Sequence, residues 1–231
     1  MKHIKHHLRR LLKIKKESYH PLQHKIHKKY HISRKTLFYM KEYGSRAHVI
    51  KTIVKESIKV LILASIISSF GGFALEKIKI IFLSIAPLII LLPALNALAG
   101  NYGSIISSRF STMLFEGKIK HQWWNNSDLK KLFIQIMIIG VITASLSSLF
   151  ALGVSRFIES EQSFEIAIKV FLIAIINVTM LITLMFFISI VAGIYFYQKK
   201  EDPNNFLIPI ATSIADFGNI VLLSILIVLF F

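Results

Sequence analysis

Five long apolar runs constrain the fold of this chain more than any other feature of its sequence. They lie at about 54–75, 79–112, 131–155, 166–197 and 206–231. Each has at least roughly the 20 residues that a helix needs to cross the ~30 Å hydrocarbon layer of a bilayer. None shows the alternating pattern of a β-barrel strand. With 54% hydrophobic residues and a mean hydropathy of +0.61, the chain is predicted to be an all-α integral membrane protein with five transmembrane helices.

Lys and Arg residues gather before the first run and predict the orientation in the membrane. Residues 1–55 hold 16 of the 28 Lys and Arg residues but only two of the 12 acidic residues. This segment is expected in the cytoplasm, because loops rich in Lys and Arg stay on that side. With five spans, the lysine-bearing loops 116–131 and 198–205 are also cytoplasmic, and the Glu-rich loop 156–165 lies outside with the C-terminus. We predict a multi-pass protein of the cell membrane.

The sequence divides into a basic cytoplasmic N-terminal segment, 1–53, and a transmembrane domain, 54–231. In the first segment Ile4, Leu8 and Leu11 recur at helical spacing among basic residues. That pattern is typical of an amphipathic helix lying on a leaflet of anionic lipid. We therefore predict a lipid partner and no nucleic acid. A nucleic-acid-binding arm and a metal-binding role for the histidines are the alternatives.

An aspartate stands alone in the last apolar run. Between Pro203 and the C-terminus, Asp216 is the only ionisable residue. A charged side chain at membrane depth costs at least a few kcal/mol, so it is expected to face a cavity, a partner or an ion. Thr212 and Asn219 share its helix face, and Ser213 lies one turn before it. Oxygen-rich company of this kind suits a hard cation such as Mg²⁺ or Ca²⁺.

The second run combines amides with residues that interrupt or narrow a helix. Asn96 and Asn101 lie five residues apart, flanked by Pro93, Gly100 and Gly103. Helix breaks at membrane depth occur where they line a cavity, and the freed carbonyls can face an ion. The alternative is that small residues here allow two helices to pack closely. The first interpretation makes Asn96, Asn101 and Gly100 pore-lining or supporting residues.

Other polar residues within the runs have simpler interpretations. Asp216 is alternatively satisfied by polar groups of another helix or by a cation, for which Lys59, Arg109 and Lys169 are the candidates. Asn177 in the fourth run is predicted to form an interhelical hydrogen bond. Arg109 lies near the cytoplasmic end of its span, where it can anchor the helix by snorkelling, pair with a loop carboxylate or, less favourably, gate ions.

Two stretches resemble the signature of the MgtE-type magnesium transporters and their eukaryotic solute-carrier relatives. They are PALNALAGNYGSIISSRFSTMLFEG (93–117) and DPNNFLIPIATSIADFGNI (202–220). The resemblance implies a homodimeric channel or carrier for divalent cations. It also implies that Asp216 lies near the two-fold axis, with Thr212 lining the pore and Ile208 one turn further on.

The N-terminus departs from the larger bacterial members of that family, which carry a cytoplasmic helical domain and paired CBS modules. Residues 1–55 are too short and too basic for either, so gating by such modules is not expected. We predict Mg²⁺ transport through a homodimeric pore, with Mg²⁺ as the bound and transported ion. A Na⁺-coupled exchanger, a Co²⁺ or Mn²⁺ transporter and a non-transporting scaffold are the alternatives. An enzyme is not expected, because the sequence offers no nucleophile–base pair and no phosphate-binding loop.

Overall fold

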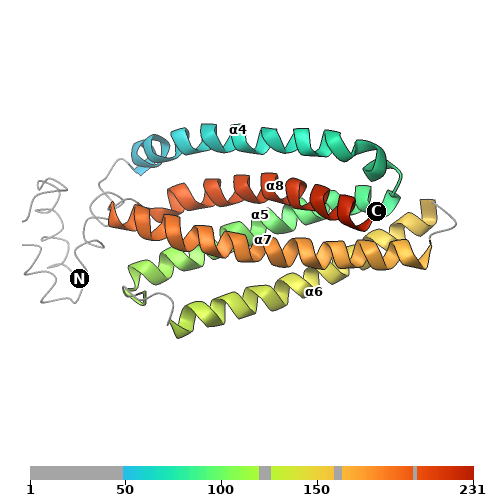
Figure 1. Cartoon of the computed structure of the whole chain (residues 1–231). Coiled ribbons are helices and arrows are strands. Elements are labelled where there is room, and N and C mark those ends of the chain that lie inside the picture. The colour runs from blue at the N-terminus through green and yellow to red at the C-terminus, as the bar shows by residue number, and fades with distance from the viewer. Residues whose placement is uncertain (1–48, 120–125, 159–162, 200–201) are drawn as a thin grey trace, which may run out of the picture.

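The computed structural model describes residues 49–119, 126–158, 163–199 and 202–231, so the predicted N-terminal segment lies almost wholly outside the described residues. Within these ranges the chain forms long helices that run side by side (Figure 1). They are α4 (Val49–Leu83), α5 (Ala86–Phe115), α6 (Ser127–Ile158), α7 (Phe164–Gln198) and α8 (Pro203–Phe230).

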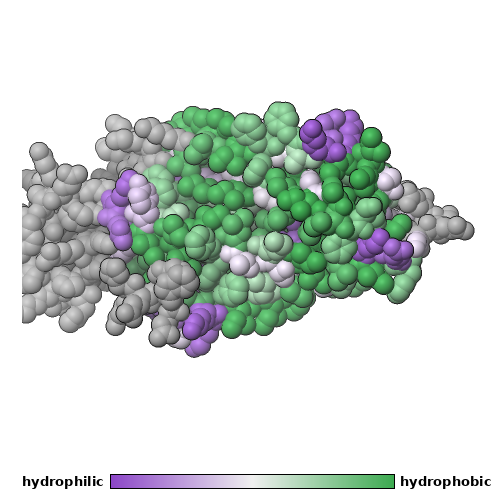
Figure 2. Space-filling view, viewed as in Figure 1, coloured by the Kyte–Doolittle hydropathy of each residue, from purple (hydrophilic) through white to green (hydrophobic). Residues whose placement is uncertain are grey.

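The predicted five membrane helices are confirmed by length and composition. Each of the five contains a segment long and apolar enough to cross a bilayer. Successive helices alternate in direction, so that α4 begins at one end of the bundle and α8 finishes at the other (Figure 1). Apolar residues cover the middle of the face seen in Figure 2, and hydrophilic residues gather toward its ends. Which end faces the cytoplasm stays a prediction.

The boundary between the first two helices differs from the predicted one. The first run was expected to end at residue 75 and the second to begin at 79, but α4 continues to Leu83 and α5 starts at Ala86. Pro87 sets this start, since a proline in the first turn of a helix lacks an N–H that would have no partner there anyway. The charged side chains near the end of α4 are exposed, so the helix can continue through them; Lys79 Nζ lies 3.5 Å from Glu76 Oε1.

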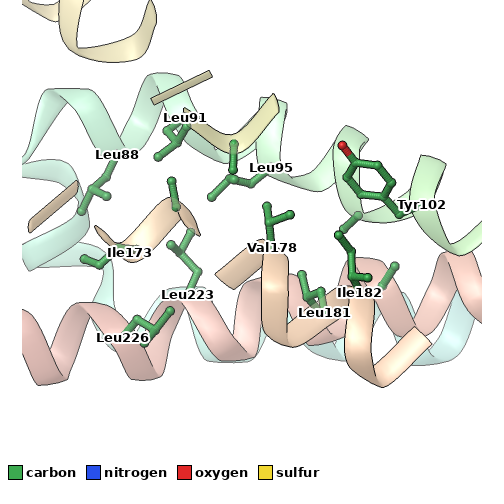
Figure 3. Packing of buried hydrophobic residues seen from close by; sticks show 14 of the residues in the cluster. Leu88, Leu91, Leu95, Tyr102, Ile173, Val178, Leu181, Ile182, Leu223 and Leu226 are labelled. Atoms are coloured by element: carbon green, nitrogen blue, oxygen red, sulfur yellow. The ribbon is translucent and has the colours of Figure 1, made fainter. Parts of the chain in front are cut away.

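Helix α8 occupies the centre of the bundle and packs against α4, α5 and α7. Helix α6 packs on α5 and α7 on the far side, and α4 has few contacts with α5. The buried core is apolar and lies between α5, α7 and α8 (Figure 3). Its members include Leu88, Leu91, Leu95, Ile173, Leu181, Ile182 and Leu223.

Small residues set the distances between the helices. A Cβ added to Gly103 of α5 would lie 3.3 Å from the Cβ of Ala211 on α8, so the two backbones approach closely there. Helix α5 runs unbroken through Pro93, Gly100 and Gly103. The predicted helix break is therefore wrong, and the packing interpretation holds at Gly103.

A proline also shapes α8. Pro209 has no N–H to donate to the carbonyl oxygen of Asn205, four residues earlier in the helix. The hydroxyl of Ser57 on α4 lies 3.5 Å from that oxygen and donates to it. A side chain of the neighbouring helix thus replaces a missing backbone donor, as helices in a bilayer require.

Gly193→Ala should destabilise the bundle. The added Cβ would lie 2.6 Å from Cε1 of the Phe110 ring, which is almost fully buried and has no room to move away. We expect the free energy of unfolding to fall by about 1–3 kcal/mol, the usual cost of overpacking. Titration of the purified protein with a denaturing detergent measures it.

Gly153→Ala is the matched control, because no atom lies within 4 Å of the Cβ it would add to α6. This variant should be as stable as the wild type or slightly more stable, since alanine favours a helix over glycine. Equal stability of the two variants would contradict the close packing of α5 against α7.

Candidate ion site

Asp216 lies midway along α8 and is half-buried in the single chain. One described side chain donates a hydrogen bond to its carboxylate: Asn96 Nδ2 on α5 lies 3.0 Å from Asp216 Oδ1. The contact joins the two sequence stretches that were predicted to form the site. It also places the carboxylate against the helix that Gly103 and Ala211 bring close to α8.

The hydrogen bond to Asp216 is the last of a series that crosses three helices. Asn219 Nδ2 on α8 donates to Asn96 Oδ1 at 3.2 Å. Asn177 Nδ2 on α7 donates to Asn219 Oδ1 at 2.5 Å. Asn177 and Asn219 have no exposed surface. We call Asn177, Asn219, Asn96 and Asp216 the amide chain; the interhelical hydrogen bond predicted for Asn177 is confirmed.

Among the described residues no cation neutralises Asp216. Lys169 Nζ instead lies 2.7 Å from Glu165 Oε1 on its own helix. Arg109 is exposed on α5 and forms no ion pair with a described residue, and nothing is described of the side chain of Lys59. The carboxylate therefore has one neutral N–H donor in the described part of the chain, and its Oδ2 has no such donor there.

Thr212 and Ile208 precede Asp216 at intervals of four residues and lie on the same stripe of α8, each half-buried. The Thr212 hydroxyl donates to the carbonyl oxygens of Ile208 and Pro209, at 2.9 and 3.1 Å. Its proton is thereby engaged, while lone pairs of its oxygen remain for a cation. Ser213 is buried and donates to Pro209 O at 2.8 Å, so it lies away from this stripe.

Asn219 was predicted to share the metal site, and the structure places it behind Asp216. It is fully buried, and both ends of its amide are bonded to other amides. Asn219 is therefore better placed to support the Asp216 carboxylate than to bind a metal ion directly.

The two amides of α5 point in different directions. Asn96 reaches Asp216, whereas Asn101 is exposed. A Cβ added to Gly100 would meet nothing within 4 Å, so the helix surface there is open. Ser108 and Thr112 are also exposed further along α5. An exposed polar stripe at membrane depth needs water or a protein partner, because lipid cannot hydrogen-bond to it.

The residues around Asp216 offer only a small number of oxygen ligands for a cation. No group of three His, Cys, Asp or Glu residues clusters within the described ranges. Asp216 and Thr212 supply a carboxylate and a hydroxyl, and hard divalent cations prefer such ligands over the nitrogen and sulfur that softer metals favour.

Sequence reasoning missed the part that Asn177 plays in the site. It predicted a hydrogen bond for this residue but not with which helix. The signal was present as three asparagines at membrane depth in three separate apolar runs. Only the packing of α5, α7 and α8 shows that they join one another and Asp216.

The sequence model of the family described as "MgtE: Divalent cation transporter" matches residues 92–226. No curated protein and no solved structure gives a significant match. The match covers more than half of the chain and contains the whole amide chain and both stretches, 93–117 and 202–220. The chain therefore belongs to the MgtE family of divalent cation transporters.

Proposed function

We propose that the protein carries Mg²⁺ across the membrane through a homodimeric pore in which Asp216 of each copy holds the ion. One observation carries this proposal: a carboxylate midway along a membrane helix has a single neutral donor among the described residues. An ionised group in that position is costly unless a counter-charge accompanies it. A divalent cation supplies that charge while it passes.

The small number of ligands favours recognition of the ion through its water. Mg²⁺ holds its waters tightly and demands octahedral geometry. Asp216 and Thr212 offer too few oxygens per chain to replace six waters, even when two copies meet. The two carboxylates repel each other in the empty pore, and a divalent ion relieves this repulsion more than a monovalent one. Selectivity for charge then arises without dehydration.

A second copy accounts for the sides of α5 and α8 that one chain leaves uncovered. Asp216 and Thr212 are only half-buried, and Asn101 is exposed at membrane depth. Lipid would leave these groups without hydrogen bonds or a counter-charge. When α5 and α8 of one copy face the same helices of a second copy, these groups line a water-filled pore between the two. The site is incomplete in one chain, because one chain brings one carboxylate.

The remaining predicted residues take supporting roles in this proposal. Ile208 forms an apolar ring one turn from Thr212, and the open surface at Gly100 leaves room for a hydrated ion. Asn96 orients the carboxylate, and Ser213 ties its hydroxyl to the backbone beside Pro209. Arg109 anchors α5 by reaching toward the membrane surface.

Asp216→Asn should reduce Mg²⁺ flux in proteoliposomes by about 100-fold, since a charged contact of roughly 3 kcal/mol is lost and this changes a rate to that extent. The variant keeps the shape of the side chain, so dimer and melting temperature should be unchanged. Flux is measured with and without an imposed Na⁺ gradient, which separates a channel from a coupled exchanger.

Asp128→Asn is the matched control, because this exposed aspartate at the start of α6 carries the same charge outside the apolar part of the bundle. It should transport at the wild-type rate. Wild-type flux in a folded Asp216→Asn variant would overturn the proposal and favour a non-transporting scaffold.

A cysteine in place of Ile208 should cross-link two copies efficiently. The natural chain contains no cysteine, so the introduced thiol is the only one in each copy. If the Ile208 stripes of two copies face each other, mild oxidation or a short bifunctional reagent in native membranes gives a covalent dimer on a denaturing gel.

Leu146→Cys serves as the comparison, since Leu146 is 62% exposed on the outer side of α6. This variant should remain monomeric on the gel. Efficient cross-linking through Leu146→Cys, with none through Ile208→Cys, would place the dimer interface on α6 and contradict the pore.

A further inference from the structure

The hydrogen bonds of the amide chain all run in one direction. Asn177 donates to Asn219, Asn219 donates to Asn96, and Asn96 donates to Asp216. An ionised carboxylate accepts hydrogen bonds but donates none, so Asn96 must turn its NH₂ group toward it. The carbonyl of Asn96 then faces Asn219, which must present its own NH₂ group, and the same requirement passes on to Asn177.

The amide chain ends on α7 at Asn177 Oδ1. This atom is buried and has no hydrogen-bond partner among the described residues. An unpaired buried acceptor costs roughly 1–3 kcal/mol, so its presence calls for a compensating gain. Turning all three amides round would pair this oxygen with Asn219 but would leave Asn177 Nδ2 without an acceptor among the described residues. It would also aim the carbonyl of Asn96 at Asp216, where two acceptors repel. The observed order is the one that serves a charged carboxylate.

We propose that Asn177 is a positioning residue of the ion site. Acting through Asn219 and Asn96, it fixes the donor that holds Asp216 Oδ1 and so leaves Oδ2 as the oxygen that meets the hydrated ion. This inference rests on the proposed function and deepens it. Asn177 never touches the ion, because it is fully buried on α7 and two amides separate it from the carboxylate.

Loss of the Asn177 donor has a defined consequence. Asn219 Oδ1 loses its donor, so the Asn219 amide is free to turn over. Asn96 then presents its carbonyl to Asp216 for part of the time, and the carboxylate loses its fixed direction. The affinity for the ion falls, whereas the pore and the number of carboxylates stay the same. The KM for Mg²⁺ should therefore rise, whereas the maximal flux should stay the same.

The test compares Asn177→Leu with Ser189→Ala in the full chain. Ser189 is a matched control on the same helix, since it is also fully buried and its Oγ lies 3.2 Å from Ser107 Oγ on α5, away from the amide chain. Asn177→Leu should raise the KM for Mg²⁺ in proteoliposomes about threefold to tenfold, as expected for one buried hydrogen bond. Maximal flux should stay within about twofold of the wild type, and Ser189→Ala should change neither quantity.

Two further variants, Asn177→Ser and Asn177→Leu combined with Asp216→Asn, separate the loss of the hydrogen bond from misfolding. Asn177→Ser keeps a small polar side chain and should raise KM as well, because a serine hydroxyl is too short to reach Asn219. The Mg²⁺-induced rise in melting temperature of the purified protein reports binding without transport. In the Asp216→Asn background this rise should be absent and Asn177→Leu should alter it no further, since the amides act only through the carboxylate.

The outcomes separate this inference from the function on which it rests. If Asp216→Asn transports normally, the ion site itself is wrong. If Asp216→Asn fails but both variants of Asn177 keep the wild-type KM, the ion site stands and the positioning role is wrong. A loss of maximal flux at unchanged KM, or an equal rise of KM in Ser189→Ala, would make Asn177 a structural residue only and overturn the inference.

Discussion

The carboxylate of Asp216 needs hydrogen-bond donors and a counter-charge, and the surrounding helices supply these only in part. A single neutral N–H from Asn96 reaches it, over 3.0 Å, and the described residues bring no cation to it. In a low-dielectric layer one such donor does not balance a negative charge. In the proposed function, a divalent cation that passes between two copies supplies the balancing charge. The hydrogen bonds of the amide chain end at this carboxylate, and its incomplete compensation is the reason for proposing an ion and a second copy.

The rest of the bundle holds that carboxylate in place with small residues and buried amides. Gly103 and Ala211 let α5 and α8 approach closely enough for Asn96 to reach Asp216. Between helices in a bilayer, packing and hydrogen bonds replace the hydrophobic effect as the source of association. The amide chain ties α5, α7 and α8 together, and we propose that it also orients the ion ligand.

The sequence predicted the helices well because each apolar run reports directly on burial in lipid. Two predictions about these helices were wrong. The first run was ended before the charged residues Glu76 and Lys77, whereas α4 continues to Leu83 and Pro87 decides where α5 begins. A break was predicted inside α5, which runs unbroken. Asp216 stood out from the sequence because a lone charge in a membrane run is rare. Asn96 and Asn177 were also singled out, but their connection to Asp216 was not predicted, because they lie on other helices and their meeting depends on packing. Orientation and assembly depend on the membrane and on a second copy, so they remain predictions.

The proposed pore requires that Asp216 meets a Mg²⁺ ion that keeps its waters. A cobalt(III) hexammine complex tests this most directly, because it resembles hydrated Mg²⁺ in size and cannot shed its ligands. Inhibition of Mg²⁺ flux by this complex is measured in proteoliposomes, while its binding to the wild type and to Asp216→Asn is measured by calorimetry. We expect the complex to compete with Mg²⁺ and the calorimetric signal to disappear in the variant. Continued Mg²⁺ flux with neither binding nor inhibition would show that the ion sheds its waters at the site, and would contradict recognition of the ion through its water.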